Sequence, residues 1–143
     1  IRANAKKAFF DTESSLFSVS DEIKDKVELA NALAILAGIC TDDEARVICD
    51  SLSNDALTPC SLSMKCFKYD ALIKCDKEKY KGAILGEIRK AYEKMIETGT
   101  VWETEVGASD FGNAGSLCHG WSAIPVYYYA ILNGEDPYSA LLR

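Results

Sequence analysis

The sequence predicts an all-α protein built from antiparallel helical hairpins. Apolar residues recur at steps of three and four along most of the 143 residues, which is the spacing of an amphipathic helix. Short turns with capping residues separate these stretches, and no segment shows the strict alternation that is typical of a strand. With 48% hydrophobic and 27% charged residues, the composition is that of a folded domain rather than of a disordered segment.

The first part of the chain is predicted to hold a helix end, a loop and a long apolar helix. Residues 1–10 read as the end of a helix, and the turn residues that follow predict a loop over 11–20. A helix is expected from Asp21 to Ala37, buried on much of its circumference. Gly38 lies where a helix C-cap is expected.

The next helix is predicted to begin with a capping box at Thr41. Its hydroxyl would accept from the amide of Glu44, and the Glu44 carboxylate would reach back to the amide of Thr41. This helix is expected to end near Leu52 and to bury one face. That face holds Ala45, Ile48, Cys49 and Leu52. Residues 29–52 therefore form a predicted helical hairpin.

Two further helices are predicted over 62–74 and 77–98, and Gly99 ends the second. The apolar stripe of the second helix comprises Ile84, Leu85, Ile88, Tyr92, Met95 and Ile96. Residues 99–115 form a glycine-rich loop whose aromatic residues favour a functional segment over a disordered one. An aromatic helix over 116–132 closes the chain. Pro125 must either kink it or lie within its first turns.

The net charge of −6 argues against a nucleic-acid partner, because the Lys and Arg residues are dispersed among acids. No apolar run approaches the ~20 residues that span a bilayer, so no membrane partner is expected. The longest run, residues 33–40, has no cationic segment before it, so no signal peptide is predicted. Ile1 lies inside a predicted helix, so we expect the chain to be cut from a longer protein whose upstream part could have held one.

The six cysteines form no C-x-x-C pair, and the sequence contains a single His. Most cysteines lie in apolar helical contexts, which favours free core thiols over disulfides and disfavours a metal site most strongly. We expect no metal and no cofactor. Free thiols favour a reducing compartment such as the cytoplasm.

The first cluster that could carry chemistry is Trp102-Glu103-Thr104-Glu105, directly after a predicted helix. A carboxylate beside a Trp is partly desolvated, which raises its pKa and suits it to proton transfer. The Trp face could also stack on a sugar. On these residues alone, an exposed Glu beside a Trp of the core is the favoured explanation of the pattern. In an extended backbone, Glu103 and Glu105 would share a face.

The second cluster is Ser116-Leu117-Cys118-His119-Gly120-Trp121-Ser122-Ala123. Ser116 could cap the last helix, which would place His119 in its first turn, facing an anionic or hydroxyl-rich ligand. Adjacent helical residues point about 100° apart, so a Cys118–His119 dyad is disfavoured.

Trp102-Glu103, the glycine-rich loop and the second cluster together resemble the six-hairpin glycosidases. They are most similar to the α-L-rhamnosidase-like group around glycoside hydrolase family 78, and the likeness covers nearly the whole chain. The resemblance implies an (α/α)₆ toroid, of which residues 1–143 would form the C-terminal part, about half.

The resemblance also implies inverting hydrolysis of a terminal α-L-rhamnoside or a related sugar. Glu103 matches the general base and His119 matches a sugar-binding residue, while Trp102 and Trp121 would wall the pocket. Cys118 stands where the family more often has Asn, so the resemblance does not fix the sugar. The family's general acid lies upstream, so the chain alone is expected to be inactive.

We expect two partners beyond a carbohydrate substrate. They are the missing N-terminal half of the barrel and, for the chain alone, a second copy, because half a toroid leaves apolar faces uncovered. The alternative from another class is a non-catalytic helical module in which the Trp102-Glu103 loop contacts a protein.

Overall fold

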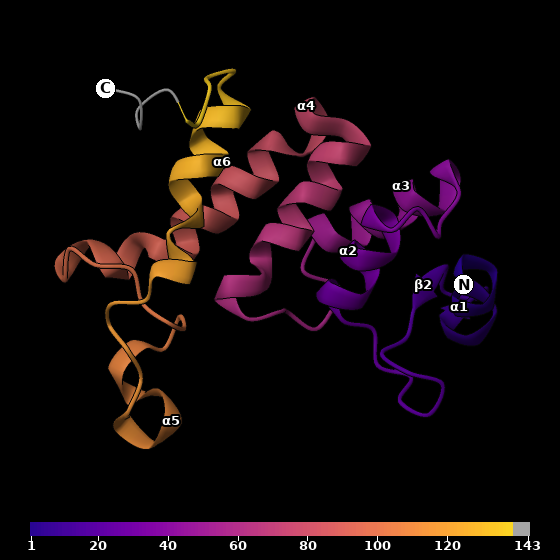
Figure 1. Ribbon diagram of the computed structural model, residues 1–143, viewed down its shortest axis with the longest axis horizontal. Helices are drawn as coiled ribbons and strands as arrows, with labels where there is room; N and C mark the ends of the chain where they lie inside the picture. The colour runs from indigo at the N-terminus through magenta and orange to yellow at the C-terminus, as the bar shows by residue number, and fades with distance from the viewer. Residues whose placement is uncertain (139–143) are drawn as a thin grey trace. The chain divides into compact units, whose positions relative to one another are not determined.

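The computed structural model describes residues 1–138 and confirms the prediction of a mostly helical chain with helical hairpins (Figure 1). The only strands in this part of the chain are two-residue segments, β1 (Phe10–Asp11) and β2 (Leu16–Phe17). The chain divides into two compact units, Ile1–Tyr80 and Lys81–Arg143. None of the helices over residues 1–138 is both long enough and apolar enough to cross a membrane.

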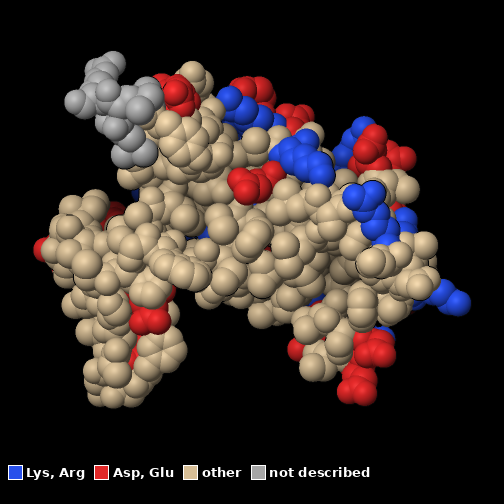
Figure 2. Space-filling model, in the orientation of Figure 1, with Lys and Arg blue, Asp and Glu red and all other residues tan. Residues whose placement is uncertain are grey.

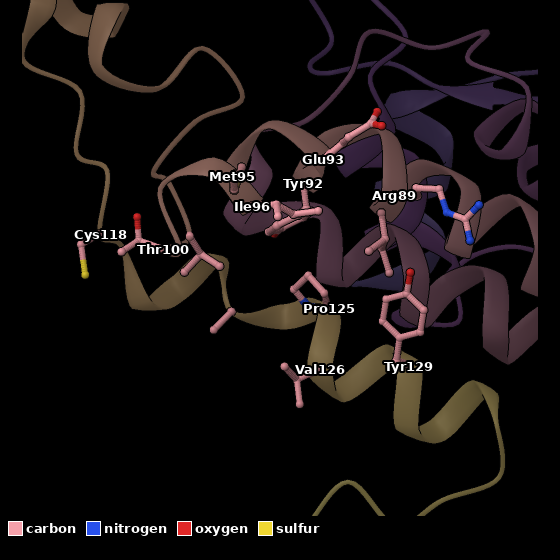
Figure 3. A pocket seen from close by; sticks show the side chains of 14 residues that line it. Arg89, Tyr92, Glu93, Met95, Ile96, Thr100, Cys118, Pro125, Val126 and Tyr129 are labelled. Atoms are coloured by element: carbon pink, nitrogen blue, oxygen red, sulfur yellow. The ribbon is translucent and has the colours of Figure 1, made fainter.

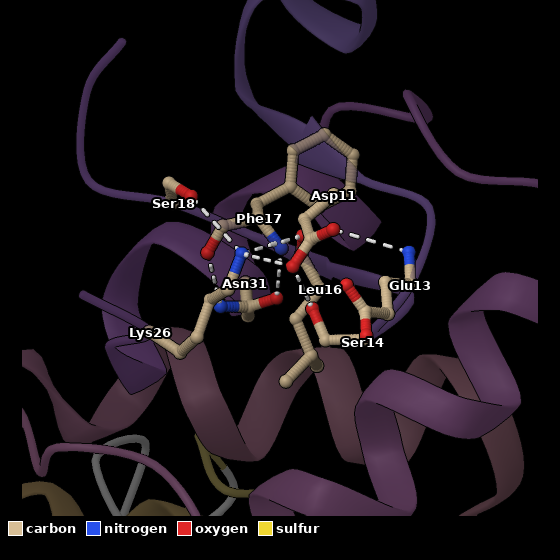
Figure 4. Close-up of polar contacts among 8 residues, drawn as sticks. All are labelled: Asp11, Glu13, Ser14, Leu16, Phe17, Ser18, Lys26 and Asn31. Atoms are coloured by element: carbon tan, nitrogen blue, oxygen red, sulfur yellow. Dashed lines mark hydrogen bonds and ion pairs between the residues drawn. The ribbon is translucent and has the colours of Figure 1, made fainter. Parts of the chain in front are cut away.

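The first unit begins with α1 (Arg2–Phe9), which leads into the small β1–β2 hairpin. Asn31 of the following helix holds this hairpin, because its side chain accepts from the Phe17 amide at 2.8 Å and donates to the Phe17 carbonyl at 3.0 Å. Lys26 adds contacts to the Ser18 hydroxyl at 3.0 Å and the Asp11 carboxylate at 3.2 Å (Figure 4). The Asn31 side chain thus satisfies the main-chain amide and carbonyl of Phe17, as the backbone of a neighbouring strand would.

The helix that was expected from Asp21 begins later, because α2 spans Glu28–Leu36. Before it, the amide of Thr58 donates to the Lys26 carbonyl at 3.0 Å, and the amide of Glu28 donates to the Thr58 carbonyl at 2.9 Å. These long-range hydrogen bonds hold the segment before Glu28 extended, and Ile23, expected on the buried face, is 53% exposed.

The turn between α2 and α3 (Asp42–Ser53) confirms the predicted hairpin. Gly38 has φ +65°, and the Gly38 and Ile39 amides donate to carbonyls of the last turn of α2, as in a Schellman motif. The Thr41–Glu44 capping box is present in full, with distances of 2.8 and 3.3 Å. α2 packs against α3, and Ile48, Cys49 and Leu52 are wholly buried.

A buried ionic cluster joins α2 to α4 (Lys65–Tyr92) within the first unit. Glu28 is only 2% exposed, and its carboxylate accepts from Lys68 at 2.5 Å, from Lys65 at 3.1 Å and from the Cys60 amide at 3.0 Å. Burial acts to raise the pKa of Glu28, but the Lys68 and Cys60 hydrogen bonds and the two ammonium charges outweigh it and lower that pKa.

The predicted break between the third and fourth helices is present inside α4, at Asp76, whose φ of −163° and ψ of 98° are extended. The Asp76 carboxylate accepts from the Lys79 amide at 3.0 Å, so it caps the second half of the helix. A short 3-10 helix, η1 (Leu62–Met64), precedes α4. Another, η2 (Glu93–Glu97), extends α4 to Gly99, which has φ +66° and ends the helix as predicted.

The rest of the second unit consists of short elements before a final helix. They are η3 (Gly107–Ser109), the single turn α5 (Asp110–Asn113), η4 (Gly120–Ser122) and α6 (Ile124–Leu132). Of the apolar stripe predicted on the preceding helix, Ile84, Ile88 and Met95 are buried, whereas Ile96 is 79% exposed. Tyr128 and Leu132 are the buried residues of α6.

Candidate active site

The two clusters singled out in the sequence lie beside each other in the second unit. The Glu103 amide donates to the Ser116 carbonyl at 2.9 Å, and the His119 amide donates to the Val101 carbonyl at 2.8 Å. These bonds join the segment around Trp102 to the segment around His119. Residues 103–116 therefore form a loop whose two ends meet, and in Figure 1 this loop is the arm that carries α5.

Glu103 lies at the base of this arm and is half-buried. One of its carboxylate oxygens accepts from the Ser116 amide at 3.4 Å, so the side chain points toward the second cluster. Glu105 lies in a different local structure from Glu103, because it belongs to a turn. The Gly107 amide closes this turn by donating to the Thr104 carbonyl at 3.1 Å. Glu105 is exposed, so the two carboxylates do not share one extended face.

Trp102 is half-buried and holds the arm in place. Its indole N–H donates to the Thr98 hydroxyl at 2.8 Å, and its main-chain amide donates to the sulfur of Met95 at 3.3 Å. The ring lies against the α-carbon of Gly107, where a Cβ would come within 2.6 Å of it. The sequence did not reveal this packing role, although a glycine five residues after a Trp is compatible with it.

A second close approach of backbone fixes the arm. A Cβ on Gly115 would lie 2.0 Å from the carbonyl oxygen of Gly107, so only glycine fits there. Gly107 itself has φ +69°, which also favours glycine. The interior of the arm is therefore closely packed near Glu103.

The helix predicted over 116–132 begins later than expected, which corrects the placement of His119. α6 starts at Ile124 with Pro125 in its first turn, where a missing amide costs nothing. The Ser116 hydroxyl accepts from the Cys118 amide at 3.2 Å instead of capping a helix. His119 has φ −131° and ψ 102°, which is extended, and its side chain is half-buried. No long helix therefore starts at His119.

Trp121 and the thiols complete the second cluster. Trp121, in η4, is 73% exposed and therefore open to a ligand. The six cysteines, all within residues 1–138, form no disulfide; Cys49 is buried and Cys118 is exposed, so Cys118 is not the core thiol that was expected. Burial raises the pKa of Cys40 to about 11 and that of Cys60 to about 12, which keeps both thiols protonated near neutral pH.

An apolar groove of about 790 Å³ lies in the same unit, between the end of α4 and the start of α6. Figure 3 shows Pro125 and Tyr129 of α6 beside Arg89 and Tyr92 of α4. None of Trp102, Glu103, His119 and Trp121 lines it. The Tyr92 hydroxyl donates to the Ser122 carbonyl at 2.7 Å, which connects the groove to the second cluster. Burial, and then the charge of Glu105, raises the pKa of Tyr92.

The part of the chain that holds the two clusters contains acidic residues and almost no basic ones. From Met95 to Leu142 the sequence contains no Lys or Arg, whereas it contains the acids Glu97, Glu103, Glu105, Asp110, Glu135 and Asp136. In Figure 2 the arm, at the lower left, shows acidic and no basic side chains on the face in view. The two clusters and the arm thus contain acidic side chains and no Lys or Arg, whereas Arg89 lines the neighbouring groove. Among residues 1–138, no group of His, Cys, Asp and Glu could hold a metal ion.

Comparison with known proteins supports the fold. No protein-family profile matches the sequence, and no curated protein is significantly similar to it. Among solved structures, the chain is similar to a rhamnosidase from Klebsiella oxytoca with rhamnose bound, with a TM-score of 0.69 and 19% sequence identity. The likeness covers 93% of this chain and 27% of that chain, so the helical fold described here is that of part of the rhamnosidase.

Proposed function

We propose that this chain belongs to the catalytic domain of an inverting glycoside hydrolase that cleaves terminal α-L-rhamnosides or a related neutral sugar. One observation carries the proposal: main-chain hydrogen bonds hold Trp102-Glu103 beside Ser116–His119, on a fold similar to that of a rhamnosidase. The one-sided acidic charge supports a neutral substrate over an anionic one.

In this mechanism Glu103 is the general base. Its carboxylate removes a proton from a water molecule as that water attacks the anomeric carbon, and the bond to the leaving oxygen breaks. A general acid from the helices N-terminal to this chain protonates that oxygen. The half-buried position of Glu103, against the Ser116 amide, holds the carboxylate toward the His119 segment. His119, Trp102 and Trp121 are the residues that contact the sugar.

The chain then supplies only part of an active site, and residues 1–143 form the C-terminal part of the catalytic barrel. The remaining helices would cover apolar side chains such as Ile96 and Val126, which are 79% and 74% exposed. Without those helices, the chain is expected to be inactive and to self-associate. The apolar groove also favours a second candidate function, a non-catalytic module that binds an apolar helix of another protein.

The test is the kinetics of three variants of the complete enzyme on an activated aryl rhamnoside. Loss of a general base costs on the order of 10²–10⁴ in rate, so Glu103→Gln should lower kcat by that amount while KM changes little. Glu105→Gln is the matched control and should lower kcat far less, and His119→Ala should chiefly raise KM. Nearly normal kcat for Glu103→Gln would end the assignment, and no hydrolysis by the unaltered enzyme would favour the binding module.

A further inference from the structure

The end of α4, with the 3-10 helix η2 that extends it, binds both segments of the candidate site. The sulfur of Met95 accepts from the Trp102 main-chain amide at 3.3 Å, and the Thr98 hydroxyl accepts from the Trp102 indole at 2.8 Å. Three residues before Met95, the Tyr92 hydroxyl donates to the Ser122 carbonyl at 2.7 Å. One end of a helix thus holds the Trp102 segment through η2 and the other segment through a single phenol.

The residue that Tyr92 binds, Ser122, is joined to the residues assigned to the sugar. Ser122 belongs to η4, the single turn that carries Trp121. The Ser122 amide donates to the His119 carbonyl at 3.0 Å, and the His119 amide donates to the Val101 carbonyl at 2.8 Å. Ser122 is fully buried, whereas Trp121 is 73% exposed. A displacement of Ser122 would therefore move His119 and Trp121 together.

Tyr92 lies on a part of the helix that packing holds in place. It is the last residue of α4 and is half-buried, while Ile88 and Met95, one turn before and after it, are 1% and 3% exposed. The sequence pattern assigns Tyr92 to the apolar stripe of this helix, and packing alone would need only its ring. Because burial raises the pKa of Tyr92, its hydroxyl stays protonated near neutral pH and remains a donor to Ser122.

We propose that Tyr92 is a positioning residue whose hydroxyl holds His119 and Trp121 where they contact the sugar. The inference rests on the proposed function, in which these two residues bind the glycosyl unit. Glu103 is held elsewhere, because its carboxylate accepts from the Ser116 amide at 3.4 Å. Loss of the Tyr92 hydroxyl should therefore weaken substrate binding more than it slows the chemical step.

The experiment removes the hydroxyl alone, with Tyr92→Phe in the complete enzyme and an aryl rhamnoside as substrate. Losing a hydrogen bond that aligns two sugar-binding residues should raise KM about tenfold, while kcat changes less than about threefold. The inhibition constant of L-rhamnose should rise by the same factor, because it reports binding without the chemical step. Replacing Tyr92 by 4-aminophenylalanine keeps a donor at the end of the ring and should restore KM.

The matched control is Tyr80→Phe. The Tyr80 hydroxyl donates to the Asp50 carboxylate, also at 2.7 Å, within the first unit. Both phenylalanine variants should lower the midpoint of thermal unfolding, and only Tyr92→Phe should raise KM.

Three results for the variants would overturn this inference and leave the proposed function standing. They are an unchanged KM for Tyr92→Phe, an equal rise of KM in Tyr92→Phe and Tyr80→Phe, and a loss in Tyr92→Phe that is confined to kcat. Failure of the unaltered enzyme to hydrolyse the rhamnoside would overturn the proposed function and this inference together.

Discussion

The α2–α3 hairpin and the segment from Gly99 to Ala123 differ in which residues adopt positive φ and in how their polar groups are hydrogen-bonded. In the hairpin, the one positive-φ residue is Gly38, at the position where a helix end requires it. The capping box satisfies the first amides of α3, and Ile48 and Leu52 are wholly buried. In the other segment, Phe111 and Asn113 adopt left-handed conformations, and Trp121 is largely exposed.

The two regions also differ in how their buried polar side chains are hydrogen-bonded. Asn31 and Glu28, both buried in the first unit, each have several hydrogen bonds. The buried hydroxyls of Thr104 and Ser122 have no hydrogen-bond partner among the described residues. Unsatisfied polar groups and unusual backbone conformations are more frequent at functional sites than elsewhere, so the contrast supports the proposal that the segment around the arm belongs to the site.

The largest effect on stability is expected at Glu28. Breaking a buried ion pair by removing one partner costs about 3–5 kcal/mol, because the remaining charges lose their compensation. Glu28→Gln should lower the free energy of unfolding by that amount, measured by urea denaturation. Glu78→Gln, at an exposed glutamate, is the control and should change it by less than about 0.5 kcal/mol. Equal effects of the two variants would contradict the stabilising role of the buried ionic cluster around Glu28.

The same cluster predicts a pH dependence. The pKa of Glu28 is lower in the folded protein than the value of about 4.3 in an unfolded chain. Its contribution to stability is therefore fully present above that unfolded value and is lost as the pH falls through the folded pKa. The stability difference between the unaltered chain and Glu28→Gln should shrink as the pH is lowered below about 4. A difference that grows on acidification would contradict the assignment.

A smaller effect is expected at the capping box. Thr41→Ala removes the acceptor for the Glu44 amide and should lower the free energy of unfolding by about 1 kcal/mol. Thr41→Ser keeps the hydroxyl and should recover most of that loss. If alanine and serine have the same effect, the hydroxyl does not stabilise α3, and the local signals at this turn are not what makes the hairpin stable.

The sequence predicted the parts of the fold that depend on near neighbours. The capping box, Gly38, the break at Asp76 and the end at Gly99 all involve residues within a few positions of each other. The start of α2 was predicted too early, because the extended segment before Glu28 pairs with Thr58, about thirty residues away. The burial of Glu28 depends on Lys65 and Lys68, which are 37 and 40 positions distant. Periodicity contains no information on such partners.

The candidate site was predictable from its motifs but not in its geometry. The resemblance named Glu103 and His119, whereas their adjacency depends on main-chain hydrogen bonds across a loop. The start of the last helix was predicted too early, because serine is a common N-cap residue and Ser116 precedes an apolar stretch. Pro125 lies in the actual first turn of α6. The left-handed conformation of Phe111, one of the aromatic residues of the glycine-rich loop, was not predicted, although Gly112-Asn113 after it is a pair that favours positive φ.

The role of Glu103 as the general base is tested most directly by rescue with azide. Glu103→Ala in the complete enzyme removes the base, and azide can attack the anomeric carbon without losing a proton. With an aryl rhamnoside as substrate, we expect azide to restore turnover and to give a glycosyl azide of inverted anomeric configuration, identified by NMR. Rescue of Glu105→Ala without rescue of Glu103→Ala would contradict the account, and so would a glycosyl azide of retained configuration.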